Sequence, residues 1–80
     1  MFEINYEAPL SPHRQIAAWL KARIESGELR AGQRIPTETD IVGITGVART
    51  TARRAIALLR EEELIFTVAG RGSYVAERGS

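Results

Sequence analysis

The sequence Thr-Gly-Val-Ala-Arg-Thr-Thr-Ala-Arg-Arg-Ala-Ile, residues 45–56, decides the fold of this 80-residue chain. It places three arginines among small side chains, and no acidic residue occurs from Val47 to Arg60. Apolar residues recur here at the i, i+3, i+4 and i+7 spacing of an amphipathic helix. We therefore expect a helix over about residues 49–62, with an apolar face made by Ala52, Ala55, Ile56 and Leu59.

A shorter helix precedes this one across a glycine-containing turn. Thr37-Glu38-Thr39-Asp40 has the spacing of a capping box, which begins a helix, and Gly46 is placed to end it. Two helices joined by such a turn form a helix-turn-helix. The small side chains of the later helix would let it pack closely against its neighbour while its arginines point outward.

The segments on the N-terminal side predict a further helix and an arm. Ser11-Pro12 is a helix start, and Gly27 is placed to end that helix. Residues 33–35 form at most a very short strand, and residues 1–10 are read as an arm or a short strand.

The segment after residue 62 predicts a β-hairpin. Residues 65–68 and 73–76 favour strands, and residues 69–72 are a glycine-rich turn. A hairpin after a helix-turn-helix forms a wing. The expected fold is therefore mainly α with a small β-hairpin wing, an α+β winged helix-turn-helix over residues 11–76, followed by a tail at residues 77–80.

Composition excludes several classes of protein. The chain is 44% hydrophobic and 26% charged, as an ordinary soluble globular domain is, and its net charge is +1. It has no cysteine, so it forms no disulfide, and it contains no apolar run of the roughly 20 residues that a membrane helix needs. Its acidic first residues are unlike a secretory signal. Any binding of nucleic acid must depend on where the charges lie.

The arginine-rich helix has the residue types that read DNA. Arg49 and Arg53 are one helical turn apart on the outer face, Thr50 adjoins them, and Thr51 and Arg54 flank them. Arginine can bond both guanine acceptors, and threonine offers a hydroxyl to phosphate and a methyl to thymine. We predict that these five residues contact DNA. The alternative is that they form only the solvated face of a surface helix.

The tip of the hairpin has a related pattern. Gly70 and Gly72 would let the backbone approach a ligand closely, and Arg71 between them could enter a minor groove. The alternative is a plain turn with an exposed arginine.

Five segments of the chain resemble the GntR family of bacterial transcription regulators, in the order and spacing of that family. They are Gln15-Ile16-Ala17, Ile24 to Leu29, Ala31 to Glu38, Gly46 to Ala55 and Gly70 to Val75. The resemblance covers about residues 9–76. It implies a winged helix-turn-helix that binds double-stranded operator DNA, with the third helix in the major groove and the wing in the minor groove, and it favours a repressor.

The resemblance also assigns roles to single residues. Arg49, Thr50 and Arg53 would contact bases or phosphates, and Gly70 and Arg71 would form the wing contact. Thr37 and Glu38 would lie near the DNA backbone or orient the arginines of the third helix.

The resemblance has consequences for partners and location as well. Family members usually continue into a C-terminal domain that binds an effector and dimerises, which these 80 residues do not include. We therefore expect a cytoplasmic, nucleoid-associated bacterial protein that is a monomer in solution, with pairing of two copies on DNA as a further possibility.

Three positions depart from the family pattern. Thr39 stands where the family often has an arginine, Ala48 stands where it often has the serine or threonine that caps the third helix, and Gly43 is unusual inside a helix. The first removes an expected DNA contact, and the second removes an N-cap worth about 1 kcal/mol.

Other functions have less support in the sequence. His13 is the single histidine and has no evident catalytic partner, so we expect a solvent-facing residue and no enzyme or cofactor. Glu61-Glu62-Glu63 could be a metal site but is read as a solvated helix end. Trp19 is read as a packing residue, with an interface role as the alternative. The main alternative function is a winged helix that binds another protein, and such binding would be insensitive to salt.

Overall fold

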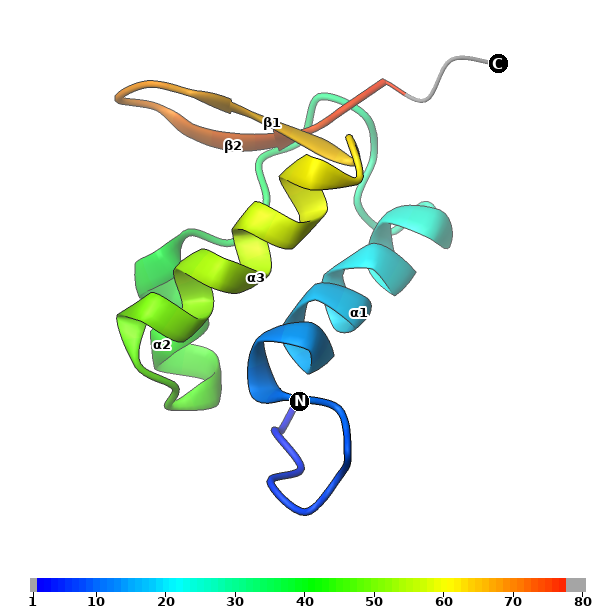
Figure 1. Cartoon of the computed structure of the whole chain (residues 1–80). Coiled ribbons are helices and arrows are strands. Elements are labelled where there is room, and N and C mark those ends of the chain that lie inside the picture. Colours follow the sequence, from blue (N-terminus) through cyan, green and yellow to red (C-terminus); the bar gives the residue numbers. More distant parts are fainter. Residues whose placement is uncertain (1, 78–80) are drawn as a thin grey trace.

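The first helix begins and ends where its sequence predicts. The computed structural model describes residues 2–77, and its helix α1 spans Pro12–Glu25 (Figure 1). Ser11 is the N-cap residue but makes no capping bond with its side chain, and Pro12 occupies the first turn. Gly27 follows the helix at a φ of 86°, a left-handed conformation that glycine adopts without strain.

The second helix, α2, spans Glu38–Thr45, and the predicted capping box begins it. The Thr37 hydroxyl accepts a hydrogen bond from the backbone N–H of Asp40, and the Asp40 carboxylate accepts one from the N–H of Thr37, both at 3.0 Å. Gly46 ends the helix in the left-handed conformation. The third helix, α3, spans Arg49–Glu61 and so ends one residue earlier than predicted.

A two-stranded antiparallel hairpin follows. Strand β1 spans Ile65–Val68 and strand β2 spans Gly72–Val75, so the second strand begins one residue earlier than predicted. The predicted short strand before α2 is reduced to a bridge between Arg34 and Tyr74. This bridge occupies the edge of β2, while the other edge of the hairpin, along β1, has no strand beside it among residues 2–77.

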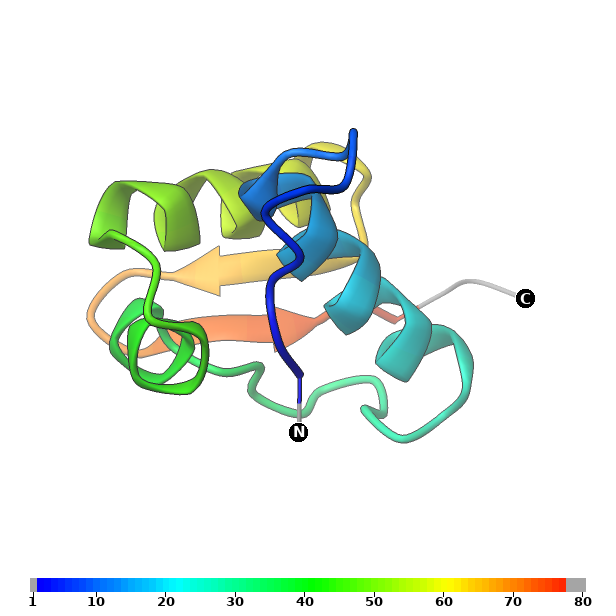
Figure 2. The ribbon, with the colours of Figure 1, turned by 90° about the horizontal axis from the view of Figure 1, so that it is seen from below.

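Helix α3 is the centre of the packing. It contacts α1, α2 and β1. Figure 1 shows α1 and α3 side by side, with the hairpin starting at the C-terminal end of α3, and Figure 2 shows the two strands of the hairpin lying antiparallel. No polar or charged side chain within residues 2–77 is buried, so the arginines of α3 lie outside the core. The buried core residues are Ile16, Ala17, Leu20, Ile24, Leu29, Ile35, Ile41, Val47, Ala52, Ala55, Ile56, Leu59, Leu64, Ile65 and Val75.

The N-terminal segment is an arm and contains no strand. Residues 2–10 fold back along α1, where the Phe2 ring stacks on the Trp19 ring with the centroids 4.6 Å apart. The Arg23 guanidinium lies 5.4 Å from the Trp19 ring centroid, which makes Trp19 a packing residue within the chain. Of the expected tail, residues 78–80 lie outside the described residues.

Candidate nucleic-acid interface

The first turn of α3 lacks a side-chain cap, as the sequence predicts. Ala48 is the N-cap residue in an extended conformation, and it has no side-chain acceptor to offer. The first helical hydrogen bonds to its carbonyl come from Thr51 and Ala52. The N–H groups of Arg49 and Thr50 therefore point out of the helix end, where the partial positive charge of the helix dipole favours an anion.

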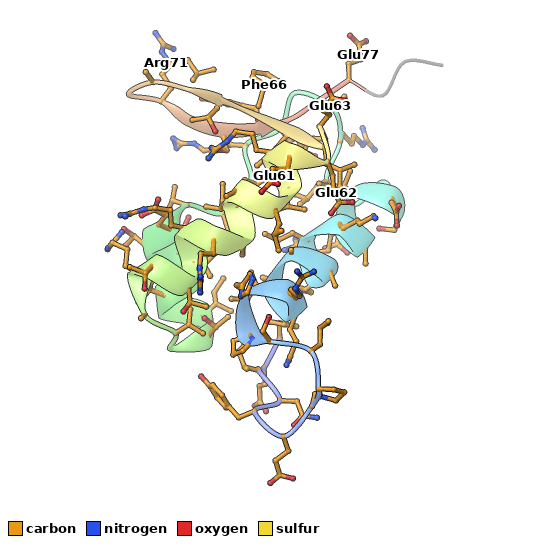
Figure 3. All side chains as sticks on the ribbon, viewed as in Figure 1. Glu61, Glu62, Glu63, Phe66, Arg71 and Glu77 are labelled. Atoms are coloured by element: carbon orange, nitrogen blue, oxygen red, sulfur yellow. The ribbon has the colours of Figure 1, made fainter. Side chains whose placement is uncertain are left out.

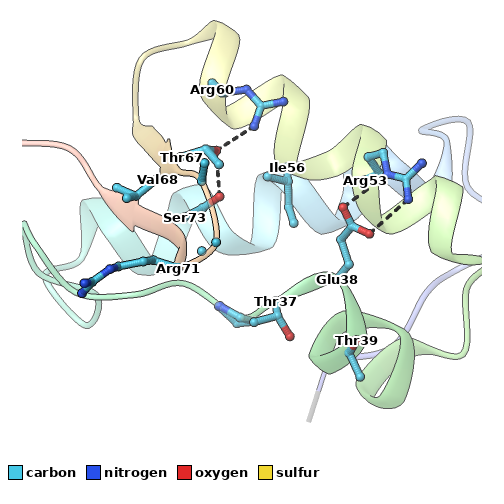
Figure 4. A pocket seen from close by; sticks show the side chains of 14 residues that line it. Thr37, Glu38, Thr39, Arg53, Ile56, Arg60, Thr67, Val68, Arg71 and Ser73 are labelled. Carbon is cyan, nitrogen blue, oxygen red and sulfur yellow. Dashed lines mark hydrogen bonds and ion pairs between the residues drawn. The ribbon is translucent and has the colours of Figure 1, made fainter.

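Glu38, at the start of α2, pairs with two arginines of α3. Its Oε1 lies 3.6 Å from Nη1 of Arg49. Its Oε2 lies 3.3 Å from Nε of Arg53, and Figure 4 shows this second pairing. The hydroxyl of Thr39 accepts a hydrogen bond from Nη2 of Arg49 at 3.2 Å. The side chains of Arg49 and Arg53 remain 52% and 60% exposed. The two guanidinium groups are thus oriented from one side while their other N–H groups face solvent.

Arg54 lies on a different side of α3, close to α1. It follows Arg53 by one residue, which is about 100° around the helix. Partial burial lowers the pKa of His13, and the nearby positive charges of Arg54 and Arg14 lower it further. His13 therefore lies near Arg54 and is partly exposed, so part of its side chain faces solvent. Its Nδ1 lies 3.2 Å from the Ser11 hydroxyl.

The three threonines of the predicted site differ in their surroundings. Thr50 is exposed on the first turn of α3, whereas Thr51 is partly buried. Thr37 is committed to the capping box, and its hydrogen bonds lower the pKa of the Asp40 carboxyl. The Thr37 side chain and backbone N–H are thus both engaged with Asp40.

The wing tip is a tight turn with an exposed arginine. The N–H of Arg71 donates to the carbonyl of Val68 at 2.9 Å, and Gly70 adopts a φ of 76°. Gly72 has a φ of 131°, and a Cβ added there would lie 3.4 Å from the Arg34 side chain. Figure 3 shows Arg71 at the end of the hairpin, projecting away from the helices.

A groove of about 400 Å³ connects these parts. Its walls are the start of α2, the outer face of α3 and the inner face of the wing (Figure 4). Thr37, Glu38, Arg53, Gly70 and Arg71, all predicted from the sequence, line it. Four other predicted residues do not line it and lie on the first turns of α3, namely Arg49, Thr50, Thr51 and Arg54.

Three further polar residues, which were not identified from the sequence, also line the groove: Arg60, Thr67 and Ser73. Arg60 follows Arg49 by eleven residues, which is about three helical turns, so it lies on the same face as Arg49 and Arg53. That spacing could have identified Arg60. No pattern in the sequence would have shown that the wing places Thr67 beside it.

The glutamates at the end of α3 do not converge on one point. Figure 3 shows the side chains of Glu61, Glu62 and Glu63 diverging, and Glu62 pairs with Lys21 at 2.9 Å. Among the described residues, no group of three histidine, cysteine, aspartate or glutamate side chains could hold a metal ion. Over the same residues, every helix is too short or too polar to cross a bilayer.

Comparison with known proteins identifies the family. The sequence profile described as "Bacterial regulatory proteins, gntR family" matches residues 12–75. The HTH-type transcriptional repressor NagR of Bacillus subtilis is 34% identical over 74 residues, which are 92% of this chain and 30% of NagR. This chain thus spans less than a third of that relative.

Solved structures agree with the sequence comparison. The structure of AraR(DBD) in complex with operator ORE1 has a TM-score of 0.82 at 33% identity, covering 91% of this chain and 89% of that one. A transcriptional antiterminator from Listeria monocytogenes EGD-e has a TM-score of 0.92 at 30% identity, covering 100% of this chain and 60% of its own. With its three helices and C-terminal hairpin, the chain belongs to the GntR family of winged helix-turn-helix DNA-binding transcription regulators, which are not enzymes.

Proposed function

We propose that this chain binds operator DNA in a sequence-specific manner as a repressor, with α3 in the major groove and the wing, residues 69–72, at the minor groove. The observation that carries the proposal is the pair Arg49 and Arg53, held by Glu38 on the exposed face at the start of α3. Oriented guanidinium groups at this end of a recognition helix suit bidentate contact with guanine. The similarity to the repressor NagR and to AraR(DBD) in complex with an operator supports this proposal.

The residues divide into two kinds of contact. Arg49, Thr50 and Arg53 would read base edges, because they project from the first turns of α3. Thr51, Arg54 and Thr37 would contact the flanking phosphates, which position a protein without reading sequence. Glu38 would orient the two arginines that it pairs with.

The wing would supply a minor-groove contact. Gly70 allows the backbone to approach the groove, and the exposed Arg71 would enter it. A narrow minor groove has a more negative potential, so A·T-rich flanks should strengthen this contact.

Two copies would bind a palindromic operator, each a monomer before it meets DNA. Half-sites of such an operator would lie about 34 Å apart, one turn of the duplex, or a multiple of that distance. The action would take place in the bacterial cytoplasm, at the nucleoid.

Selection from a pool of random duplexes at two salt concentrations tests the proposal. We expect an enriched motif and an affinity that falls steeply with salt, by about 0.9 in log–log slope for each phosphate neutralised. Arg49→Ala and Arg53→Ala should each weaken binding to the selected site by about 1–3 kcal/mol and relax the sequence preference at one base pair.

Arg30→Ala is the matched control, because Arg30 is exposed and lies in the loop between α1 and α2, away from the groove. Equal losses on selected and random duplexes would make Arg49 and Arg53 phosphate contacts only. No duplex binding at low salt, together with salt-insensitive binding to another protein, would instead favour a protein-interaction module.

A further inference from the structure

Arg60 lines the groove between α3 and the wing and has no part in the base contacts proposed above. Nη1 of Arg60 donates a hydrogen bond to the Thr67 hydroxyl at 2.7 Å, and that hydroxyl lies 2.9 Å from the hydroxyl of Ser73. Figure 4 shows this chain of three side chains running from α3 to the inner face of the wing. It connects the two elements that are expected to lie in different grooves of the DNA.

Arg60 also differs from Arg53, which lines the same groove, in its charge balance. Arg53 shares the carboxylate of Glu38 with Arg49. Within residues 2–77, no carboxylate lies at ion-pair distance from Arg60, and its one hydrogen-bond acceptor is the neutral Thr67. The positive charge of Arg60 is therefore uncompensated beside an open groove, where an anion would stabilise it.

The shape of the groove suits an extended strand. Ile56, which is 7% exposed, lines the space between Arg53 and Arg60. Thr37 borders the groove on the α2 side, and Thr67 and Ser73 border it on the wing side. Cations and hydroxyls thus surround an apolar base, and the Glu38 carboxylate on the same lining is paired with Arg53. This composition matches charged phosphates linked by apolar sugars.

We propose that this groove binds the sugar–phosphate backbone that separates the major groove from the minor groove, with Arg60 as the main phosphate contact. The inference rests on the proposed function: if α3 lies in the major groove and the wing lies at the adjacent minor groove, one DNA strand must pass between them. The groove is the surface over which that strand passes.

The hydroxyl pair has a defined part in this contact. Thr67 accepts a hydrogen bond from Arg60, so its own hydrogen can be donated to Ser73. The Ser73 hydrogen is then free to be donated to a phosphate oxygen. Thr67 holds Arg60 in place, and Arg60 and Ser73 contact the same phosphate.

The salt dependence of binding tests the role of Arg60. Arg60→Ala should lower the log–log salt slope by about 0.9 and weaken a selected duplex and a random duplex by the same factor, because phosphates carry no sequence information. Arg60→Gln keeps a donor for Thr67 and should show the same loss, and Arg60→Lys should restore the slope. Arg30→Ala should leave the slope unchanged.

A methylphosphonate scan locates the contact. Each phosphate of the selected duplex is replaced in turn by an uncharged methylphosphonate. The wild-type chain should lose affinity when the replacement lies between the base pairs read by α3 and those beside the wing, and Arg60→Gln should not respond there.

The outcomes separate this inference from the proposed function. A wild-type chain that binds no duplex would overturn both. A wild-type chain with an Arg49-dependent motif, alongside Arg60 variants that keep the wild-type slope and respond to every methylphosphonate, would overturn only the role of Arg60. Arg60 variants that lose affinity for the selected duplex alone would likewise overturn only the role of Arg60.

Discussion

Replacing Glu38 with glutamine should separate the affinity of this domain for DNA from its specificity. Glu38→Gln keeps the size of the side chain and removes the carboxylate that lies 3.3 Å from Arg53 and 3.6 Å from Arg49. Both arginines are more than half exposed, so each pairing is worth about 0.2–1 kcal/mol. Loss of both pairings, about 0.4–2 kcal/mol together, should lower the ratio of specific to random binding by about twofold to thirtyfold, since 1.4 kcal/mol is a factor of ten.

Random duplexes should respond in the opposite direction. The Glu38 carboxylate repels phosphate, and its removal leaves two uncompensated guanidinium groups at the interface. We therefore expect Glu38→Gln to bind random DNA a few-fold more tightly, with a steeper salt dependence. A small loss of stability should accompany it, because Glu38 lies in the first turn of α2, where the helix dipole favours an acidic residue by about 0.3–1 kcal/mol.

Fluorescence anisotropy titrations of a selected and a random duplex, at several salt concentrations, measure both the specificity ratio and the affinity for random DNA. Glu28→Gln is the matched control, because it removes the same charge from an exposed glutamate that pairs with Arg23, away from the groove. If Glu38→Gln keeps the specificity ratio within twofold of the wild type, Glu38 does not orient the arginines and the reasoning fails.

Three further predictions concern stability and protonation. Gly43→Ala should raise the free energy of unfolding by about 0.5–1 kcal/mol, because a Cβ there meets nothing within 4 Å. A lower free energy of unfolding, measured by chemical denaturation, would contradict this. Ala48→Ser should add about 1 kcal/mol by capping α3, and an unchanged denaturation midpoint would show that the cap does not form. Arg54→Ala should raise the pKa of His13 in an NMR titration, because the charge of Arg54 helps to lower it. Since the folded pKa of His13 is lowered, its contribution to stability is present above the ordinary imidazole pKa of about 6.5 and is lost as the pH falls through the folded value.

Much of the fold could be predicted from short-range patterns. The capping box of Thr37 and Asp40, the glycines that follow α1 and α2, and the apolar face of α3 are all formed by residues close in sequence. The errors were small and lay at ends: α3 is one residue shorter, and β2 begins at Gly72. The arm was left open between two readings because loose alternation over a few residues does not separate an extended arm from a strand.

The sequence by itself determined the three helices, the hairpin and the outward direction of the α3 arginines, since helical period and capping depend on neighbours within a few residues. Only the tertiary structure decided which partners those arginines have. Glu38 reaches Arg53 from 15 residues away because α2 packs against α3, and Arg60 meets Thr67 because the hairpin folds back onto the end of α3. Helix packing and hairpin docking set these distances, and neither leaves a periodic signal in the sequence.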